Sequence, residues 1–156
     1  MSFPRPLTAL EKDIIHLLLS AEFPGSAELD RQVEDAVASR PMVEGLPSIY
    51  IDVETSFQAE NADNRKSPIT AVVANENEEL VGFILLAFAD GLLSYLEFAW
   101  VTDEAPTEFP PADRIFLDSD PRSVKVSRKL PSTHIPRERS SKVSDLDPTQ
   151  GRRSTQ

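Results

Sequence analysis

Cysteine is absent from the 156 residues of this chain. The absence excludes a disulfide framework, a thiolate nucleophile and a zinc site built on cysteine ligands. It fits a protein of the reducing cytoplasm, which is the location that we expect. Histidine is almost as scarce, with 2 residues, so the chain offers little for nucleophilic catalysis that depends on a neighbouring base.

The chain also lacks a long, uninterrupted apolar run. Its most apolar stretch, residues 83–100 (FILLAFADGLLSYLEFAW), contains Asp90 and Glu97. A membrane-spanning helix needs about 20 apolar residues, and carboxylates are costly in lipid. The opening MSFPRPLTAL has one arginine and no apolar region of the kind that secretory signals contain. We therefore expect neither a membrane span nor a secretory signal.

Basic residues are few and unevenly placed. The chain holds 16 Lys and Arg against 26 Asp and Glu, a net charge of −10. Residues 1–120 contain 7 basic and 23 acidic side chains, whereas residues 121–156 contain 9 basic and 3 acidic ones. An acidic body repels phosphate, so we expect no nucleic-acid partner for the folded part. The basic tail is the one segment that favours such a partner, although a solvated, unfolded tail has the same composition.

Asp90 and Gly91 interrupt the apolar stretch and predict a tight turn. Asp-Gly between apolar runs favours a type I′ hairpin turn, because both central residues need positive φ. The prediction is a strand over residues 79–89 and another over 92–101. Alternation along the second strand places one set of side chains toward the core (Leu96, Phe98, Trp100) and the other toward solvent (Leu93, Tyr95, Glu97, Ala99). The first strand is apolar on both faces, so it should be central in its sheet.

Two helices are predicted before the strands. Thr8 and Glu11 have the spacing of a capping box, and the residues that follow repeat apolar side chains at helical intervals (Leu10, Ile14, Leu17, Leu18). A second helix is predicted from Ser26 to a stop at Pro41, on the spacing of Leu29, Val33, Ala36 and Val37.

Residues 49–54 alternate as a half-buried strand, and residues 69–74 form a shorter one. The predicted fold class is α+β, with two N-terminal helices packed on one face of a four-stranded, mostly antiparallel sheet in meander order. Residues 1–118 should form a single domain. Residues 119–156 are rich in Pro, Ser, Lys and Arg and should form a largely disordered tail, although residues 115–130 contain enough apolar side chains for an edge strand or a docked segment.

Two segments resemble a family of small, uncharacterised bacterial α+β proteins. LTALEKDIIHLLLSAEFPGSAELDRQV is similar to the leucine-rich helix, short break and second helix of that family. VGFILLAFADGLLSYLEFAW is similar to its strand, Asp-Gly turn and strand with "LE"; Gly82, Asp90, Gly91, Leu96 and Glu97 match. The family has glycine after this glutamate, where this chain has Phe98, and a "DEPWP" end that is DEAPTEFP here. The resemblance implies a bacterial source and the helix–helix–sheet order, and it implies no activity.

Candidate site residues are mostly acidic. Asp52 and Glu54 project from one side of the strand 49–54, and Tyr95 and Glu97 project together from the last strand. If these strands are neighbours, the four residues line one acidic sheet face; the alternative is that this face is merely solvated. His16 shares a helix face with Asp13, which allows a metal ligand pair, an acid–base pair or an ordinary boundary residue, and no further metal ligands stand at a diagnostic spacing. His134 falls in the predicted tail. No metal site, cofactor or Gly-rich phosphate loop is predicted.

Three hypotheses about function follow from these residues. The first is a non-enzymatic interaction module, for example an immunity-like protein, that binds a basic patch on another protein through an acidic surface. The second is a small-molecule binding domain with a pocket between helices and sheet. The third is a hydrolase that depends on a divalent cation held by Asp52, Glu54 and Glu97, since hard oxygen ligands suit Mg²⁺ or Ca²⁺.

Overall fold

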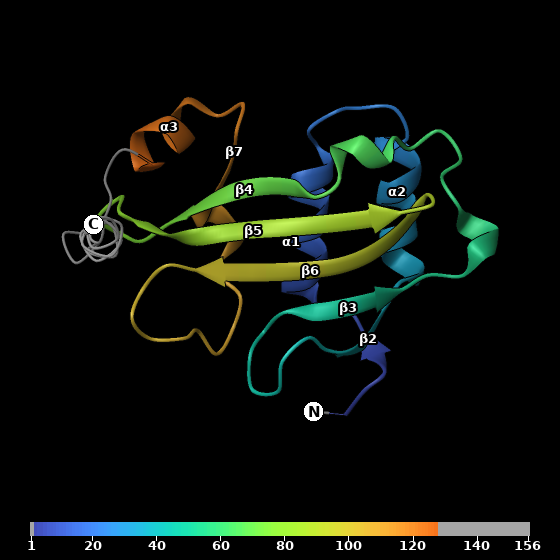
Figure 1. The fold of residues 1–156 in the computed structure, drawn as a ribbon, viewed down its shortest axis with the longest axis horizontal. Coiled ribbons are helices and arrows are strands. Elements are labelled where there is room, and N and C mark those ends of the chain that lie inside the picture. The colour runs from blue at the N-terminus through green and yellow to red at the C-terminus, as the bar shows by residue number, and fades with distance from the viewer. Residues whose placement is uncertain (1, 128–156) are drawn as a thin grey trace, which may run out of the picture.

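An antiparallel sheet forms the centre of the molecule (Figure 1). The structure is a computed structural model, and it describes residues 2–127. Within these residues the sheet has seven strands in the order β1-β2-β3-β6-β5-β4-β7. The strands are β1 Arg5–Pro6, β2 Val37–Pro41, β3 Ile49–Asp52, β4 Ile69–Ala74, β5 Leu80–Ala89, β6 Leu92–Trp100 and β7 Ile115–Leu117. The predicted α+β class and the antiparallel sheet are confirmed, and the predicted number of four strands is wrong.

The strand order also differs from the predicted meander. β4, β5 and β6 follow one another as expected, but β3 pairs with β6 and not with β4. The chain between β3 and β4, residues 53–68, therefore crosses from one side of the hairpin to the other, which is a Greek-key arrangement. This long connection carries no apolar periodicity, so no local pattern indicates which strand β3 joins.

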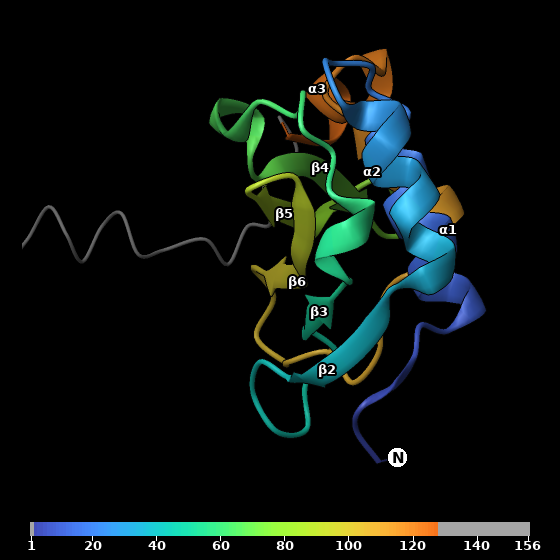
Figure 2. The same cartoon turned by 90° about the vertical axis from the view of Figure 1, so that its right-hand side faces the viewer.

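α1 (Ala9–Leu19) begins as predicted. Thr8 accepts a hydrogen bond from the Glu11 amide at 3.1 Å, and the Glu11 side chain accepts one from the Thr8 amide at 2.8 Å, which completes the capping box. α1 and α2 (Ser26–Gln32) lie along one face of the sheet (Figure 2). The main core fills the space between these two helices and the sheet. It includes Ile14, Leu29 and Leu96, each fully buried.

The predicted second helix is too long. α2 ends at Gln32, a single 3₁₀ turn occupies Val33–Asp35, and the chain then becomes β2. A helix through these residues would place the Pro41 ring against the carbonyl of residue 37, and Val37 has a β-branched side chain that suits a strand. As a strand, the segment pairs with both β1 and β3. These non-local hydrogen bonds outweigh the weak local preference for helix.

The Asp-Gly turn is confirmed. Asp90 has φ of 55° and Gly91 φ of 76°, as a type I′ turn requires. A Cβ on Gly91 would lie 2.4 Å from the Ala59 carbonyl oxygen, so only glycine fits against the neighbouring loop. The predicted outward direction of Leu93 is wrong, because this side chain is 2% exposed. The register shifts between Ala87 and Phe88, which leaves one extra residue in β6 and turns Leu93 inward.

A smaller apolar cluster lies on the face of β4 and β7 that points away from α1 and α2. α3 (Pro121–Ser127) contributes Val126, which packs with Val72, Leu80 and Phe116. β7 supplies the edge strand that was one of two expectations for residues 115–130. The predicted tail begins at residue 119, but α3 packs residues 121–127 onto the sheet; the rest of that tail, residues 128–156, lies outside the described residues.

Asp120 holds the start of α3. Its carboxylate accepts a hydrogen bond from the Arg122 amide at 2.9 Å and pairs with the Arg122 guanidinium at 2.7 Å. The side-chain hydrogen bond with Arg122 is the main reason that the pKa of Asp120 lies below its ordinary value. Pro121 occupies the first helical position, where its missing N–H costs nothing.

A depressed carboxyl pKa stabilises the folded state above the unfolded pKa, and this contribution is lost as pH falls through the folded pKa. We expect the amide protection of α3, corrected for intrinsic exchange rates, to fall below about pH 4 before that of α1 does. Hydrogen exchange measured by NMR at a series of pH values tests this. Asp120→Asn keeps an oxygen that can cap α3 but does not titrate. If α3 loses its amide protection at low pH in this variant as it does in the wild-type protein, protonation of Asp120 is not the cause of that loss.

Candidate functional site

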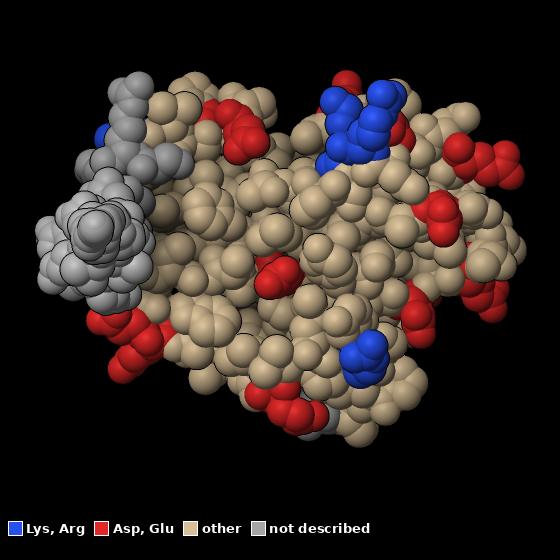
Figure 3. All heavy atoms as spheres, viewed as in Figure 1, with Lys and Arg blue, Asp and Glu red and all other residues tan. Residues whose placement is uncertain are grey.

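Within residues 2–127, one face of the sheet is largely uncovered. α1 and α2 cover the other face, and α3 covers only the end near β4 and β7. On the open face lie partly buried apolar side chains from three adjacent strands, and several of them, including Tyr50, Leu85 and Tyr95, belong to neither core cluster. Figure 3 shows this face as mostly uncharged, with acidic side chains mainly along its rim. We call it the open sheet face, formed by Tyr50, Phe83, Leu85, Tyr95, Glu97 and Ala99.

Two tyrosines form an aromatic row across the open sheet face. Tyr50 of β3 pairs directly with Tyr95 of β6, and their rings meet edge to face with centroids 6.5 Å apart. The Arg40 guanidinium of β2 lies 4.1 Å from the centre of the Tyr50 ring. Aromatic and cation–π contacts of this kind hold side chains in one arrangement. The row is therefore ordered before any partner arrives.

Glu97 lies next to this row and faces Leu85 across the β5–β6 pair. It is partly buried, and its side chain makes no hydrogen bond or ion pair within residues 2–127. Tyr95 and Ala99, two positions away on either side, share its face. A carboxylate that has lost part of its water to apolar neighbours gains most from an incoming cation. The Glu97 carboxylate therefore has the charge and the exposure to pair with a Lys or Arg side chain.

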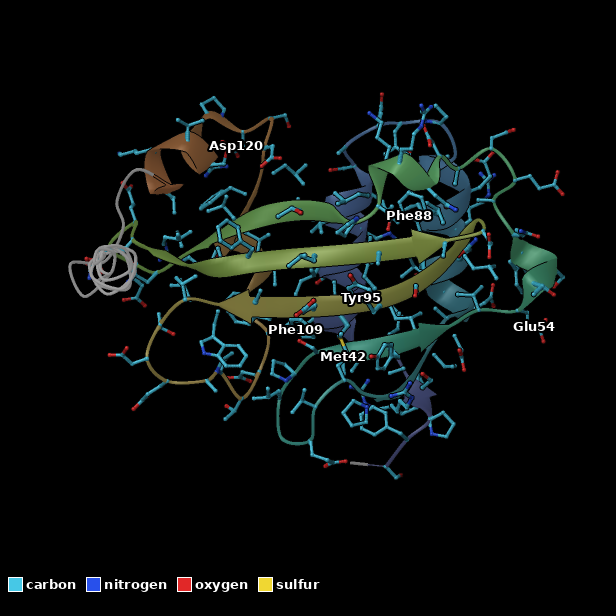
Figure 4. The ribbon with its side chains drawn as sticks, viewed as in Figure 1. Met42, Glu54, Phe88, Tyr95, Phe109 and Asp120 are labelled. Atoms are coloured by element: carbon cyan, nitrogen blue, oxygen red, sulfur yellow. The ribbon has the colours of Figure 1, made fainter. Side chains whose placement is uncertain are left out.

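The four predicted site residues do not form one cluster. Tyr95 and Glu97 lie together in the middle of the sheet, as expected. Asp52 lies on the neighbouring strand, but the Tyr50–Tyr95 register places it about 13 Å along the strand from the position opposite Glu97. Glu54 lies beyond the end of β3, far from Tyr95 (Figure 4).

Asp52 and Glu54 instead line a separate cleft of about 590 Å³ at the end of β3. We call it the acidic cleft, and its lining consists of Asp35, Val37, Asp52, Val53, Glu54 and Phe57. The Phe57 side chain is 44% exposed there. Within the described residues no group of three His, Cys, Asp or Glu side chains is arranged to hold a metal ion. Carboxylates spread around an aromatic ring suit a long organic cation such as Lys or Arg better than a small divalent ion.

His16 takes part in a contact between α1 and α2. Its Nδ1 lies 2.6 Å from Asp30, and its Nε2 lies 3.6 Å from Glu34, which also pairs with Lys12 at 3.2 Å. The hydrogen bond from Lys12 is the main cause of the lowered pKa of Glu34. The contacts of His16 are thus with α2 and the 3₁₀ turn that follows it, and not with Asp13, and they fit the boundary role. His134 lies outside the described residues.

Sequence reasoning missed Asp35, Arg40 and Phe57. Asp35 and Arg40 fell in a segment predicted as helix, and Phe57 follows β3 in a region without periodicity. The useful signal was the alternation of Tyr50 and Tyr95 in their strands, because it indicated that both rings point away from the main core. Which strands pair, and in which register, had no local signal.

No protein-family model, curated protein or solved structure matches this chain. The resemblance to small bacterial α+β proteins therefore stays a prediction. None of the helices within residues 2–127 combines the length and the apolar content that crossing a membrane requires.

Proposed function

We propose that this protein is a non-enzymatic interaction module that binds another protein through the open sheet face, with the acidic cleft beside it. The observation that carries the proposal is Glu97, a partly buried carboxylate that has no side-chain partner within residues 2–127 and lies on an apolar face that these residues leave uncovered. The partner presents a Lys or Arg side chain flanked by apolar ones. Immunity-like inhibition, in which the bound surface of the partner is blocked, is one form of such binding.

Charge complementarity supports a basic partner. Residues 1–127 contain 9 basic and 23 acidic side chains, a net charge of −14. The negative electrostatic potential that this charge creates speeds the approach of a basic protein and repels acidic ones. The effect weakens as salt is added. The open sheet face itself is nearly uncharged (Figure 3), so long-range attraction and short-range apolar contact are provided by different residues.

The aromatic row supports an interface at the same place. Tyrosine is enriched among residues that dominate binding energy, because a rigid ring buries much surface at a low cost in conformational entropy. Tyr50 and Tyr95 are already fixed against each other. When a partner covers these two rings, little conformational entropy is therefore lost on this side of the interface.

Selection of a displayed peptide library against the immobilised protein tests the proposal without knowledge of the natural partner. We expect enriched peptides to contain Lys or Arg next to apolar residues, and to bind Glu97→Gln about tenfold more weakly, since a charge-assisted contact is lost. Glu22→Gln, an exposed acid just after α1, makes the same chemical change elsewhere and should bind normally. Enriched peptides without basic residues, or equal binding to Glu97→Gln, would contradict the proposal.

A further inference from the structure

A second concave site lies on the opposite side of the sheet from the open sheet face. It is a cleft of about 440 Å³ between the turn that joins β4 to β5 and the proline-rich segment after β6. Val81 and Phe98 line it; Phe98 belongs to the main core and Val81 packs against that core. Pro106, Pro110 and Pro111 also line the cleft, and we call them the proline wall. The cleft has the size and the mainly apolar lining of small-molecule sites.

The proline wall is held in place before any ligand binds. Proline fixes its own φ, so a segment with three prolines loses little further freedom when a ligand contacts it. Phe109 anchors the same segment, because its side chain is 6% exposed and packs within the main core. The cleft is therefore preformed.

Arg114 supplies a single positive charge to this cleft. The residue is partly buried, and its Nη1 donates one hydrogen bond, at 3.2 Å, to the carbonyl oxygen of Asn75. No carboxylate lies within 4.0 Å of it among residues 2–127, although this part of the chain is rich in acids. A guanidinium has five N–H donors, arranged so that two of them match the two oxygens of a carboxylate. Most of the donors of Arg114 thus have no partner within residues 2–127.

We infer that this cleft binds a small amphipathic carboxylate, whose apolar body lies on Phe98 and the prolines and whose carboxylate pairs with Arg114. Glu76 also lines the cleft but forms no ion pair with Arg114. Its repulsion of the ligand is partly screened at physiological salt, and Glu76→Gln should strengthen binding. This site is independent of the proposed function, because Glu97 and the tyrosine row lie on the other face.

Titration of the full chain with octanoate, followed by NMR, tests the inference, with octanamide as the neutral analogue. We expect octanoate to shift resonances around Arg114 in a saturable way and to bind about tenfold more tightly than octanamide. Arg114→Gln should remove this preference. Arg31→Gln, an exposed arginine that also has no carboxylate partner within the described residues, and Glu97→Gln should keep it.

Equal affinities of octanoate and octanamide for the wild-type protein would overturn the inference, as would the absence of saturable binding at about 10 mM octanoate. Both of these measurements use the unmodified chain, so they remain decisive even if Arg114→Gln fails to fold. A preference for octanoate that persists in a folded Arg114→Gln variant would place the carboxylate elsewhere and would also overturn it.

Discussion

Gln32→Ala is expected to lower the free energy of unfolding by about 3–5 kcal/mol. Gln32 is 1% exposed, and its side-chain amide joins three parts of the chain. Nε2 donates to the carbonyl oxygens of Phe57, at 2.9 Å, and Gly91, at 2.7 Å, and Oε1 accepts from the Leu93 amide at 3.0 Å. Alanine would leave the Phe57 carbonyl and the Leu93 amide without this partner, and the Gly91 carbonyl would keep only its bond from the Ala59 amide at 2.8 Å. It would also leave a cavity.

Chemical denaturation followed by circular dichroism measures this loss. Gln58→Ala is the matched control, because Gln58 also donates to the same hairpin turn, at the Asp90 carbonyl oxygen, but is exposed. Its loss should cost about 0.5 kcal/mol or less. A loss below about 1 kcal/mol for Gln32→Ala would show that water satisfies the Phe57 carbonyl and the Leu93 amide, and that Gln32 does not fix the hairpin to α2.

Glu11→Ala is expected to cost about 3–5 kcal/mol, because it breaks a largely buried ion pair from one side. The two guanidinium nitrogens Nη1 and Nη2 of Arg5 each lie 2.9 Å from a carboxylate oxygen of Glu11, which is 4% exposed. The hydrogen bond with Glu11 raises the pKa of Arg5 above its ordinary value. Alanine would leave the Arg5 charge uncompensated and would also remove half of the capping box at Thr8.

The double variant Arg5→Met with Glu11→Leu tests this explanation. Replacing both partners of a buried pair by apolar side chains is often nearly neutral, whereas removing one is not. Arg5 Nε is buried and has no hydrogen-bond partner among the residues that the structure describes, so the double variant also removes one unsatisfied donor. We expect it to recover more than half of the loss seen in Glu11→Ala. Equal destabilisation of the single and double variants would assign the effect to the capping box.

Local signals in the sequence predicted the features that depend on neighbouring residues. The Thr8–Glu11 capping box and the Asp90-Gly91 turn formed as expected, because each is decided by residues within a few positions of one another. Residues 37–41 were predicted as helix and became β2, since pairing with β1 and β3 involves residues far along the chain. The inward turn of Leu93 also depends on a register shift that alternation alone does not reveal.

In the candidate site, too, only the features that depend on neighbouring residues could be predicted from the sequence. Tyr95 and Glu97 share a face because they are two positions apart in one strand, and this much follows from alternation. Asp52 and Glu54 were grouped with them on the assumption that β3 and β6 are neighbours. The strands are neighbours, but the Tyr50–Tyr95 register moves these two acids to the acidic cleft. Arg114 and its proline wall meet only in the folded chain.

The central claim is that Glu97 on the open sheet face pairs with a cation of a partner protein. Calorimetric titration in a double-mutant cycle tests it most directly: the wild-type protein and Glu97→Gln are each titrated with the best selected peptide and with the same peptide carrying Met in place of its basic residue. We predict a coupling energy of about 1–2 kcal/mol between Glu97 and that basic residue. Strictly additive losses, with no coupling, would contradict the claim.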